Sequence, residues 1–151
     1  MTHGPDDVSD EQHRASERRR IPSRVAAVRA RLDAAIAAAA VRGVPVRRSE
    51  YMVEHSSAGP IGCSPLGALV LDVPARHDHE EAMRLLDITP EELWAIEAGF
   101  QGWDQDDYDP HWYELGQRYA LALGLECPEV QWPEDRDAER RAEACVERMR
   151  R

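Results

Sequence analysis

The hydrophobic positions of this chain recur mainly at helical spacing, so we expect a mainly α-helical protein. Residues 22–42 carry apolar side chains three and four positions apart: Val25, Val28, Leu32, Ile36 and Ala39. Gly43 and Pro45 follow, and both are typical of the chain just beyond a helix. The spacing therefore predicts one helix over residues 22–42 with a narrow apolar face.

The next segment has a different pattern. Between residues 46 and 61, apolar residues are mixed with serine, glycine and proline, which indicates a short extended stretch and a turn and leaves a small β-hairpin open. Ser64 and Pro65 then have the order of a helix cap followed by a first-turn proline. We expect a short helix there, ended by Pro74, that buries Leu66, Leu69 and Val70.

Two further helices are predicted, one over Asp78–Leu86 and one that starts at Thr89-Pro90-Glu91-Glu92. The second sequence is a capping box, in which the threonine and the later glutamate each accept a hydrogen bond from the other's main-chain N–H. The helix should bury Leu93, Ile96 and Phe100. Trp94 falls about 100° to one side of this face and is expected to be partly exposed.

An acidic loop follows Gly102 and leads into another predicted helix, which Gly124 ends. Glycine in the middle of a helix costs about 1 kcal/mol relative to alanine, so we expect another helix to approach closely at Gly116. The predicted buried face consists of Trp112, Leu115, Gly116, Tyr119 and Leu123. A last helix offers only a thin apolar stripe: Ala138, Ala142, Cys145 and Met149.

Together these elements predict a small helical bundle with a short β-hairpin and flanking N- and C-terminal helices. The first twenty residues hold almost no apolar side chains and are expected to be disordered. The thin stripes of the flanking helices leave a homodimer open. The predicted order is a disordered tail (1–20), a helical domain (21–126) made of the helix 22–42 and an acidic body 46–126, a linker (127–133) and a C-terminal helix (134–151).

Charge is distributed unevenly along the 151 residues, whose net charge is −10. Residues 51–135 hold eighteen acidic residues against three arginines, whereas residues 1–50 and 136–151 are each slightly basic. An acidic body repels phosphates and attracts cations, so we expect a protein partner with a basic surface and no nucleic acid. All the basic residues besides histidine are arginine, which indicates a GC-rich bacterial or phage genome.

Export and membrane insertion are not expected. The first residues lack the charged and apolar regions of a secretion signal, and the longest apolar run, 34–41, is far shorter than the roughly 20 residues that cross a bilayer. Cys63, Cys127 and Cys145 are too few and too widely spaced for a disulfide framework or a metal knuckle. We therefore expect a cytoplasmic protein with free thiols.

The sequence Gly62-Cys63-Ser64-Pro65-Leu66-Gly67-Ala68-Leu69 resembles small uncharacterised helical proteins of GC-rich bacteria and phages, which carry a Cys-Pro-Leu-Gly-Ala-Leu-like helix start. The resemblance extends over residues 51–124, through Gly99-Phe100-Gln101-Gly102 and Tyr113–Gly116. It departs at Ser64, which separates the cysteine from the proline. The group implies no activity.

Part of the chain also resembles a repressor-type helix-turn-helix. Glu80–Thr89 corresponds to the second helix and turn, Leu93–Gly99 to the recognition helix and Leu115–Leu125 to the closing helix. DNA recognition needs basic or amide side chains at the start of the recognition helix, where this chain has Pro90-Glu91-Glu92. DNA binding is therefore an alternative, with phosphate contacts supplied by the Arg-rich segment Arg14–Arg24.

Signals for catalysis are sparse, and neither enzymatic activity nor a cofactor is expected. His77 and His79 diverge at a predicted helix start, whereas zinc needs three or four converging ligands. Cys63 precedes a predicted helix, where the dipole would favour a thiolate, although a small buried thiol is the simpler interpretation. The aspartates of residues 104–109 lack the glycine and closing glutamate of a calcium loop. A thiol or metal-dependent enzyme centred on Cys63 or His77 and His79 is the second alternative.

Seven of the nine aromatic residues lie between Trp94 and Tyr119, around the acidic loop. Phe100, Trp112 and Tyr119 are expected to be buried. The remaining rings lie beside carboxylates, which is the composition of a rigid anchor for an arginine-rich partner. We therefore predict a non-enzymatic regulatory or adaptor protein that binds another protein through Trp94, Trp103, Asp104, Asp106, Asp107, Tyr108, Asp109 and Tyr113.

Overall fold

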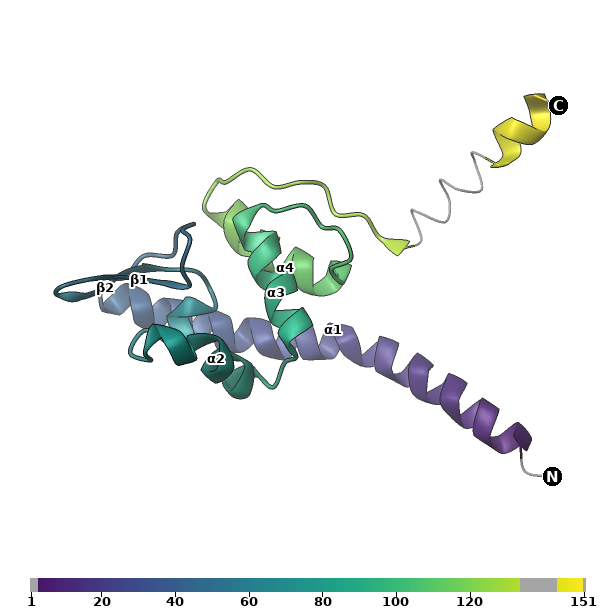
Figure 1. Ribbon diagram of the computed structural model, residues 1–151, viewed down its shortest axis with the longest axis horizontal. Coiled ribbons are helices and arrows are strands. Elements are labelled where there is room, and N and C mark those ends of the chain that lie inside the picture. Colours follow the sequence, from purple (N-terminus) through teal and green to yellow (C-terminus); the bar gives the residue numbers. More distant parts are fainter. Residues whose placement is uncertain (1–2, 134–143, 151) are drawn as a thin grey trace. The chain divides into compact units, whose positions relative to one another are not determined.

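The structure is a computed structural model that describes the backbone of residues 3–133 and 144–150 and the side chains of residues 20–133 and 144–150. Most of these residues are helical, and their strands form a two-stranded antiparallel hairpin, so the predicted fold class is confirmed (Figure 1). The chain divides into two units, residues 1–93 and 94–151. The boundary between the two units falls inside the helix that begins at Pro90.

Unit 1 begins with helix α1, which runs from His3 to Val41 and includes Pro22 (Figure 1). The structure differs here from the predicted disordered tail, because residues 3–20 are helical. A lack of apolar side chains prevents burial in a core but does not prevent helix formation, which arginine, glutamate and glutamine favour. Further along α1 the predicted narrow face is confirmed, since Val28, Leu32 and Ala39 are buried.

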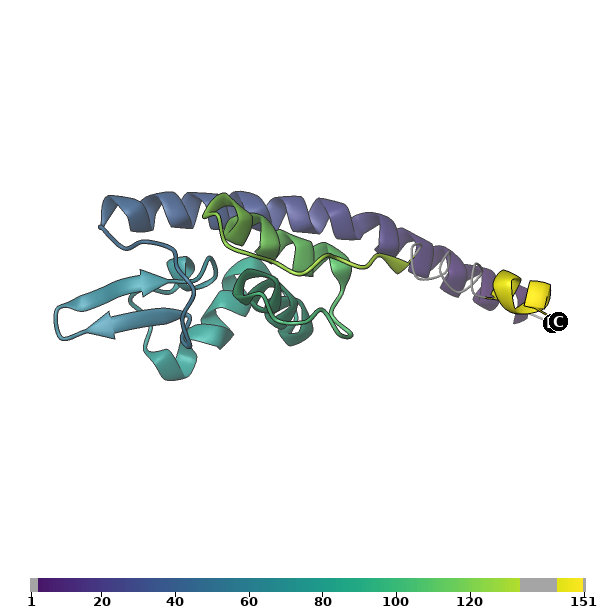
Figure 2. The ribbon, with the colours of Figure 1, turned by 90° about the horizontal axis from the view of Figure 1, so that it is seen from above.

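Strands β1 (Val53–Ser56) and β2 (Gly59–Cys63) form the predicted hairpin, and Figure 2 shows them side by side. Val53 pairs with Cys63 and Ser56 with Gly59, with an irregularity in between. Val46 adds an isolated parallel bridge to Cys63. The C-terminal end of β2 is therefore bonded on both sides.

The segment after β2 lies in the core of unit 1, and every residue from Gly62 to Ala68 is buried. The Ser64 hydroxyl accepts a hydrogen bond from the Gly67 N–H at 3.1 Å, as expected of a cap. The predicted short helix is the 3-10 helix η1 (Gly67–Leu69). A Cβ on Gly67 would stand 1.9 Å from the Met52 carbonyl oxygen, so only glycine fits there.

After the 3-10 helix η2 (Ala75–His77), α2 has the predicted bounds Asp78–Leu86, and α3 runs from Pro90 to Gln101. The capping box is confirmed. The Thr89 N–H donates to Glu92 Oε1 at 3.0 Å, and the Glu92 N–H donates to Thr89 Oγ1 at 3.2 Å. Between the helices, Asp87 has the left-handed conformation (φ 54°), which is typical of a residue that ends a helix.

Unit 2 contains most of α3 together with α4, which runs from Pro110 to Ala122. A Cβ on Gly116 would stand 1.9 Å from the Ile96 carbonyl oxygen, and one on Gly99 would stand 2.0 Å from that of Tyr113. The close helix contact predicted at Gly116 is therefore confirmed. Leu123, which was predicted to be buried, is 47% exposed because it lies beyond the end of α4.

The chain after α4 turns at Gly124, whose φ is +75°, and runs on without regular structure through Trp132. Residues 144–150 are helical, while the rest of the predicted C-terminal helix, residues 134–143 and 151, lies outside the described residues. None of the described helices is both long enough and apolar enough to span a bilayer.

Candidate protein-binding site

The candidate site begins where α3 ends. Gly102 has φ 77°, and the Trp103 N–H donates a hydrogen bond to the Ala98 carbonyl oxygen at 3.0 Å. This Schellman arrangement fixes the direction in which the chain leaves the helix. The Trp103 side chain is 48% exposed, and Trp94, one helical turn before Ala98, is 43% exposed. One half-exposed indole therefore lies near the start of α3 and the other just beyond its end.

Residues 103–108, which we call the acidic loop, contain a tight turn. The Tyr108 N–H donates to the Gln105 carbonyl oxygen at 2.9 Å, and Asp106 has a positive φ of 46°. Aspartate tolerates this left-handed conformation better than most residues. Asp104, Asp106 and Asp107 are all exposed on this loop.

Asp109, which was predicted to contact a partner, also has a structural role. It is the N-cap of α4, and its Oδ1 accepts hydrogen bonds from the N–H groups of His111 at 2.9 Å and Trp112 at 3.3 Å. Pro110 occupies the first helical position, where a missing N–H costs nothing. This cap fixes the end of the acidic loop.

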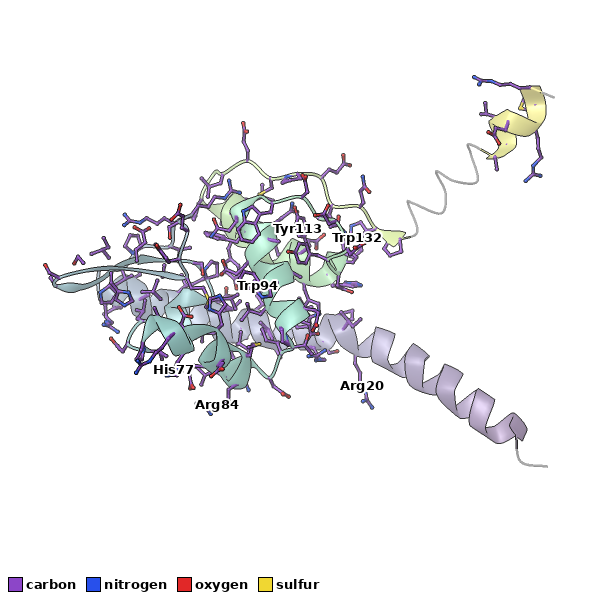
Figure 3. The ribbon with its side chains drawn as sticks, in the orientation of Figure 1. Arg20, His77, Arg84, Trp94, Tyr113 and Trp132 are labelled. Atoms are coloured by element: carbon purple, nitrogen blue, oxygen red, sulfur yellow. The ribbon has the colours of Figure 1, made fainter. Side chains whose placement is uncertain are left out.

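Tyr113 is also not at the surface where the sequence predicted it. It is fully buried, its hydroxyl donates a hydrogen bond to the Trp103 carbonyl oxygen, and its ring lies 6.5 Å from that of Tyr108 in a stacked arrangement. The predicted apolar stripe of α4 was too narrow, because the loop and the chain after α4 cover a second face of the helix. In Figure 3 the labelled side chains of Trp94, Tyr113 and Trp132 all belong to unit 2.

Gln105, in the middle of the acidic loop, was missed by sequence analysis. It is only 8% exposed, and its side-chain amide forms two hydrogen bonds with the main chain of Gln131. The Gln131 N–H donates to Gln105 Oε1 at 2.7 Å, and Gln105 Nε2 donates to the Gln131 carbonyl oxygen at 3.0 Å. No sequence signal distinguishes this glutamine from an exposed loop residue, because its partner is 26 positions away.

Among residues 94–133, little basic charge lies close to the acidic loop in sequence. Arg118 is the only arginine in residues 94–133, and it pairs with Glu114 at 3.7 Å. Among the side chains that the structure describes, none forms an ion pair with Asp104, Asp106 or Asp107. The loop therefore presents three exposed carboxylates that attract a basic group from outside.

The helix-turn-helix resemblance can be compared with α2 and α3. Both helices and the intervening turn are present, but every residue from Leu93 to Phe100 except Trp94 is buried. Arg24, part of the predicted phosphate-binding segment, donates to both Glu92 carboxylate oxygens at 2.7 Å. Burial raises the pKa of the Glu92 carboxyl, yet the hydrogen bonds from Arg24 and Thr89 outweigh it and hold that pKa below its ordinary value.

The residues of the enzymatic alternative do not converge. Cys63 is fully buried, and its Sγ lies 3.9 Å from the Pro45 carbonyl oxygen. His79 Nδ1 lies 2.6 Å from Asp78 Oδ1, whereas His77 is exposed. Within the described part of the chain, no group of three His, Cys, Asp or Glu side chains is placed to hold a metal ion.

No protein family, curated protein or solved structure matches this chain. The interpretation of the acidic loop therefore rests on its own geometry and charge.

Proposed function

We propose that this protein is a non-enzymatic adaptor or regulator that binds a basic protein partner through the acidic loop. One observation carries the proposal: a loop whose three exposed carboxylates form no ion pair with the described side chains is tied at its two ends by the Tyr113 hydroxyl and the Asp109 cap. In this proposal the exposed indoles of Trp103 and Trp94 add apolar contact area beside the charges, and the partner is a protein of the same bacterial or phage cytoplasm.

The rigidity of the loop is the strongest support. Its first residue is held by Ala98 and Tyr113 and its end by the Asp109 cap. Carboxylates on a flexible loop would lose conformational entropy on binding, and a loop already ordered avoids that loss. Mutual repulsion among aspartates favours an open loop, so holding them together has a cost that binding a cation relieves.

Side-chain chemistry favours a protein partner over DNA. Carboxylates repel phosphates, and arginine is the residue that pairs with carboxylates in two parallel hydrogen bonds and also stacks on indole rings. In the DNA-binding alternative, helix α3 would have to enter a DNA groove. Its first turns expose Glu91 and Trp94, and neither side chain is basic. Both points support recognition of arginine-rich protein surfaces.

The proposal is tested by capturing proteins from a lysate of the source organism on three immobilised forms of the full chain. One is the wild type, and one is the loop variant Asp104→Asn, Asp106→Asn and Asp107→Asn. The third is a matched control, Glu50→Gln, Glu80→Gln and Glu91→Gln, which removes the same charge from exposed side chains outside the acidic loop and the chain after α4.

We expect the wild type and the control to capture the same basic protein, identified by mass spectrometry, and the loop variant to lose it. Asparagine tolerates the left-handed conformation at Asp106, so the loop variant should keep its fold. Equal capture by all three forms, or equal loss in the control and the loop variant, would contradict the proposal.

A further inference from the structure

Residues 127–133, which we call the strap, are held to unit 2 mainly through their main chain. Gln105 bonds both main-chain groups of Gln131, at 2.7 and 3.0 Å, and Gln117 Nε2 donates to the Pro128 carbonyl oxygen. Both glutamines are buried, with 8% and 4% exposure. Such bonds hold an extended chain largely independently of its side chains, as in main-chain peptide recognition.

The strap contributes little buried surface of its own. None of its residues is buried, and its described ring contact is the edge-on packing of Trp132 against His111, with 4.8 Å between ring centroids. Segments held by few buried apolar contacts open at low free-energy cost. Among the described residues of unit 2, the strap is therefore a segment that opens at low free-energy cost.

The charge of the strap does not match its surroundings. Gln105, which holds the strap, is flanked in sequence by Asp104 and Asp106, whose side chains are both exposed. Residues 126–133 contain Glu126 and Glu129 and no arginine or lysine. An acidic segment thus occupies an acidic site, where a basic segment with the same main chain would bind more favourably.

We propose that Gln105 and Gln117 form a main-chain clamp for an extended basic segment of a partner protein, and that this segment displaces the strap. The inference rests on the proposed function and states how the partner is bound: extended, with basic side chains beside Asp104 and Asp106 and an aromatic ring against His111. The strap is then an intramolecular competitor that lowers the apparent affinity of the site.

The first test uses fluorescent peptides that copy residues 126–133 with Cys127→Ser. One peptide keeps both glutamates, and the other carries Glu126→Arg and Glu129→Arg. With the wild-type protein, we expect the basic peptide to bind about tenfold more tightly than the acidic one, because it exchanges repulsion for ion pairs. Equal affinities would overturn the inference.

The second test changes the two competitors separately. Gln131→Pro in the full chain removes the main-chain N–H that donates a hydrogen bond to Gln105 Oε1. This change weakens the strap and leaves the peptide unaltered, so the basic peptide should bind about three- to tenfold more tightly. N-methylation of the peptide at the position of Gln131 weakens the peptide alone, and its affinity for the wild type should fall by about the same factor. Methylation at the position of Val130 is the control and should have a smaller effect.

The third test combines N-methylation of the peptide with Gln105→Ala in the protein, as a double-mutant cycle. In this variant, N-methylation at the position of Gln131 should no longer matter. If methylation is equally harmful with and without Gln105, or if Gln131→Pro weakens peptide binding, the clamp is overturned.

The acidic loop variant separates failure of the clamp from failure of the proposed function. Basic-peptide binding that requires the three aspartates but ignores both methylation and Gln131→Pro would overturn the clamp and leave the proposed function standing. Basic-peptide binding that survives loss of the three aspartates would contradict both.

Discussion

The hydroxyl of the buried Tyr113 donates a hydrogen bond to the main-chain carbonyl of Trp103, ten residues earlier in the chain. Because Trp103 starts the acidic loop and Tyr113 lies in the first turns of α4, this bond closes the loop across its base. The stack of Tyr108 on the Tyr113 ring supports the loop from the same side. The buried tyrosine thus holds in place the carboxylates that face solvent.

Replacing Tyr113 by phenylalanine should loosen the acidic loop. Tyr113→Phe keeps the ring and removes the hydrogen bond, which should lower the free energy of unfolding by about 1 kcal/mol. Hydrogen exchange of the main-chain amides of residues 104–108 should become faster in the same variant. Tyr108→Phe, which keeps the stacked ring, is the matched control. If both variants exchange at the wild-type rate, the Tyr113 hydroxyl does not hold the loop.

The contact between α3 and α4 should not tolerate a methyl group. Gly116→Ala gains about 1 kcal/mol of helix propensity, but its Cβ would overlap the Ile96 carbonyl oxygen and force the helices apart. We expect a net loss of about 1–3 kcal/mol in the free energy of unfolding, measured by urea titration. Leu121→Ala, on an exposed position of the same helix, should change it by less than about 0.5 kcal/mol. A stabilised Gly116→Ala variant would contradict the close contact.

The pH dependence of stability should reflect Glu92. Its folded-state pKa lies below the ordinary value despite the opposing effect of burial, because Arg24 and Thr89 bond the carboxylate. The folded state therefore favours the ionised form, and this stabilisation is fully present above the pKa of the unfolded chain and is lost as the pH falls through the folded-state pKa.

We expect Glu92→Gln to reduce the loss of stability of the wild type between about pH 5 and pH 3, followed by urea unfolding. Glu91→Gln, at the neighbouring exposed side chain, is the matched control and should leave the pH profile closer to that of the wild type. Identical profiles for the wild type and Glu92→Gln would show that the ion pair with Arg24 contributes nothing in solution.

The local elements of the fold could be predicted because their determinants lie close together in the sequence. The Thr89 and Glu92 capping box and the close contact at Gly116 each follow from one short motif and a known cost. The first twenty residues were predicted to be disordered because they hold few apolar side chains. A lack of apolar side chains indicates that a segment is not buried, but it does not determine whether the segment is helical, and residues 3–20 are helical. Helical spacing alone placed Leu123 on the buried stripe of α4, but the helix ends at Ala122 and Leu123 is exposed.

The candidate site could be predicted only in part. Trp103 and the exposed aspartates stand out by composition, but the burial of Tyr113 and the capping role of Asp109 were not predicted, because their hydrogen-bond partners depend on the path of the loop. Gln105 was missed because its burial is produced by the strap, a segment that the sequence presents as a linker. Contacts between residues that are far apart in sequence, and polar residues that they bury, leave no periodic signal.

Thiol reactivity distinguishes the buried cysteine from the others. Cys63 is fully buried, Cys127 is half-buried and Cys145 is exposed. In the native protein, we expect a bulky maleimide to modify Cys145 first, and Cys63 to react only after unfolding in guanidinium chloride, as read by peptide mass spectrometry. Rapid native modification of Cys63 would contradict its burial and revive the interpretation of a reactive thiol.

The most direct test of the central claim is the salt dependence of binding to an arginine-rich peptide, measured by fluorescence anisotropy for three forms of the full chain. The acidic loop variant and the Glu50, Glu80 and Glu91 control have equal net charge, so general attraction to an acidic protein is the same in both. Because exposed charges are screened over roughly 8 Å at physiological ionic strength, specific pairing should weaken steeply as salt rises. We predict that the wild type and the control bind with similar affinity and salt slope, and that the loop variant binds at least about tenfold more weakly with a shallower slope. Equal affinity and slope for the loop variant and the control would contradict the assignment of the acidic loop as the binding site.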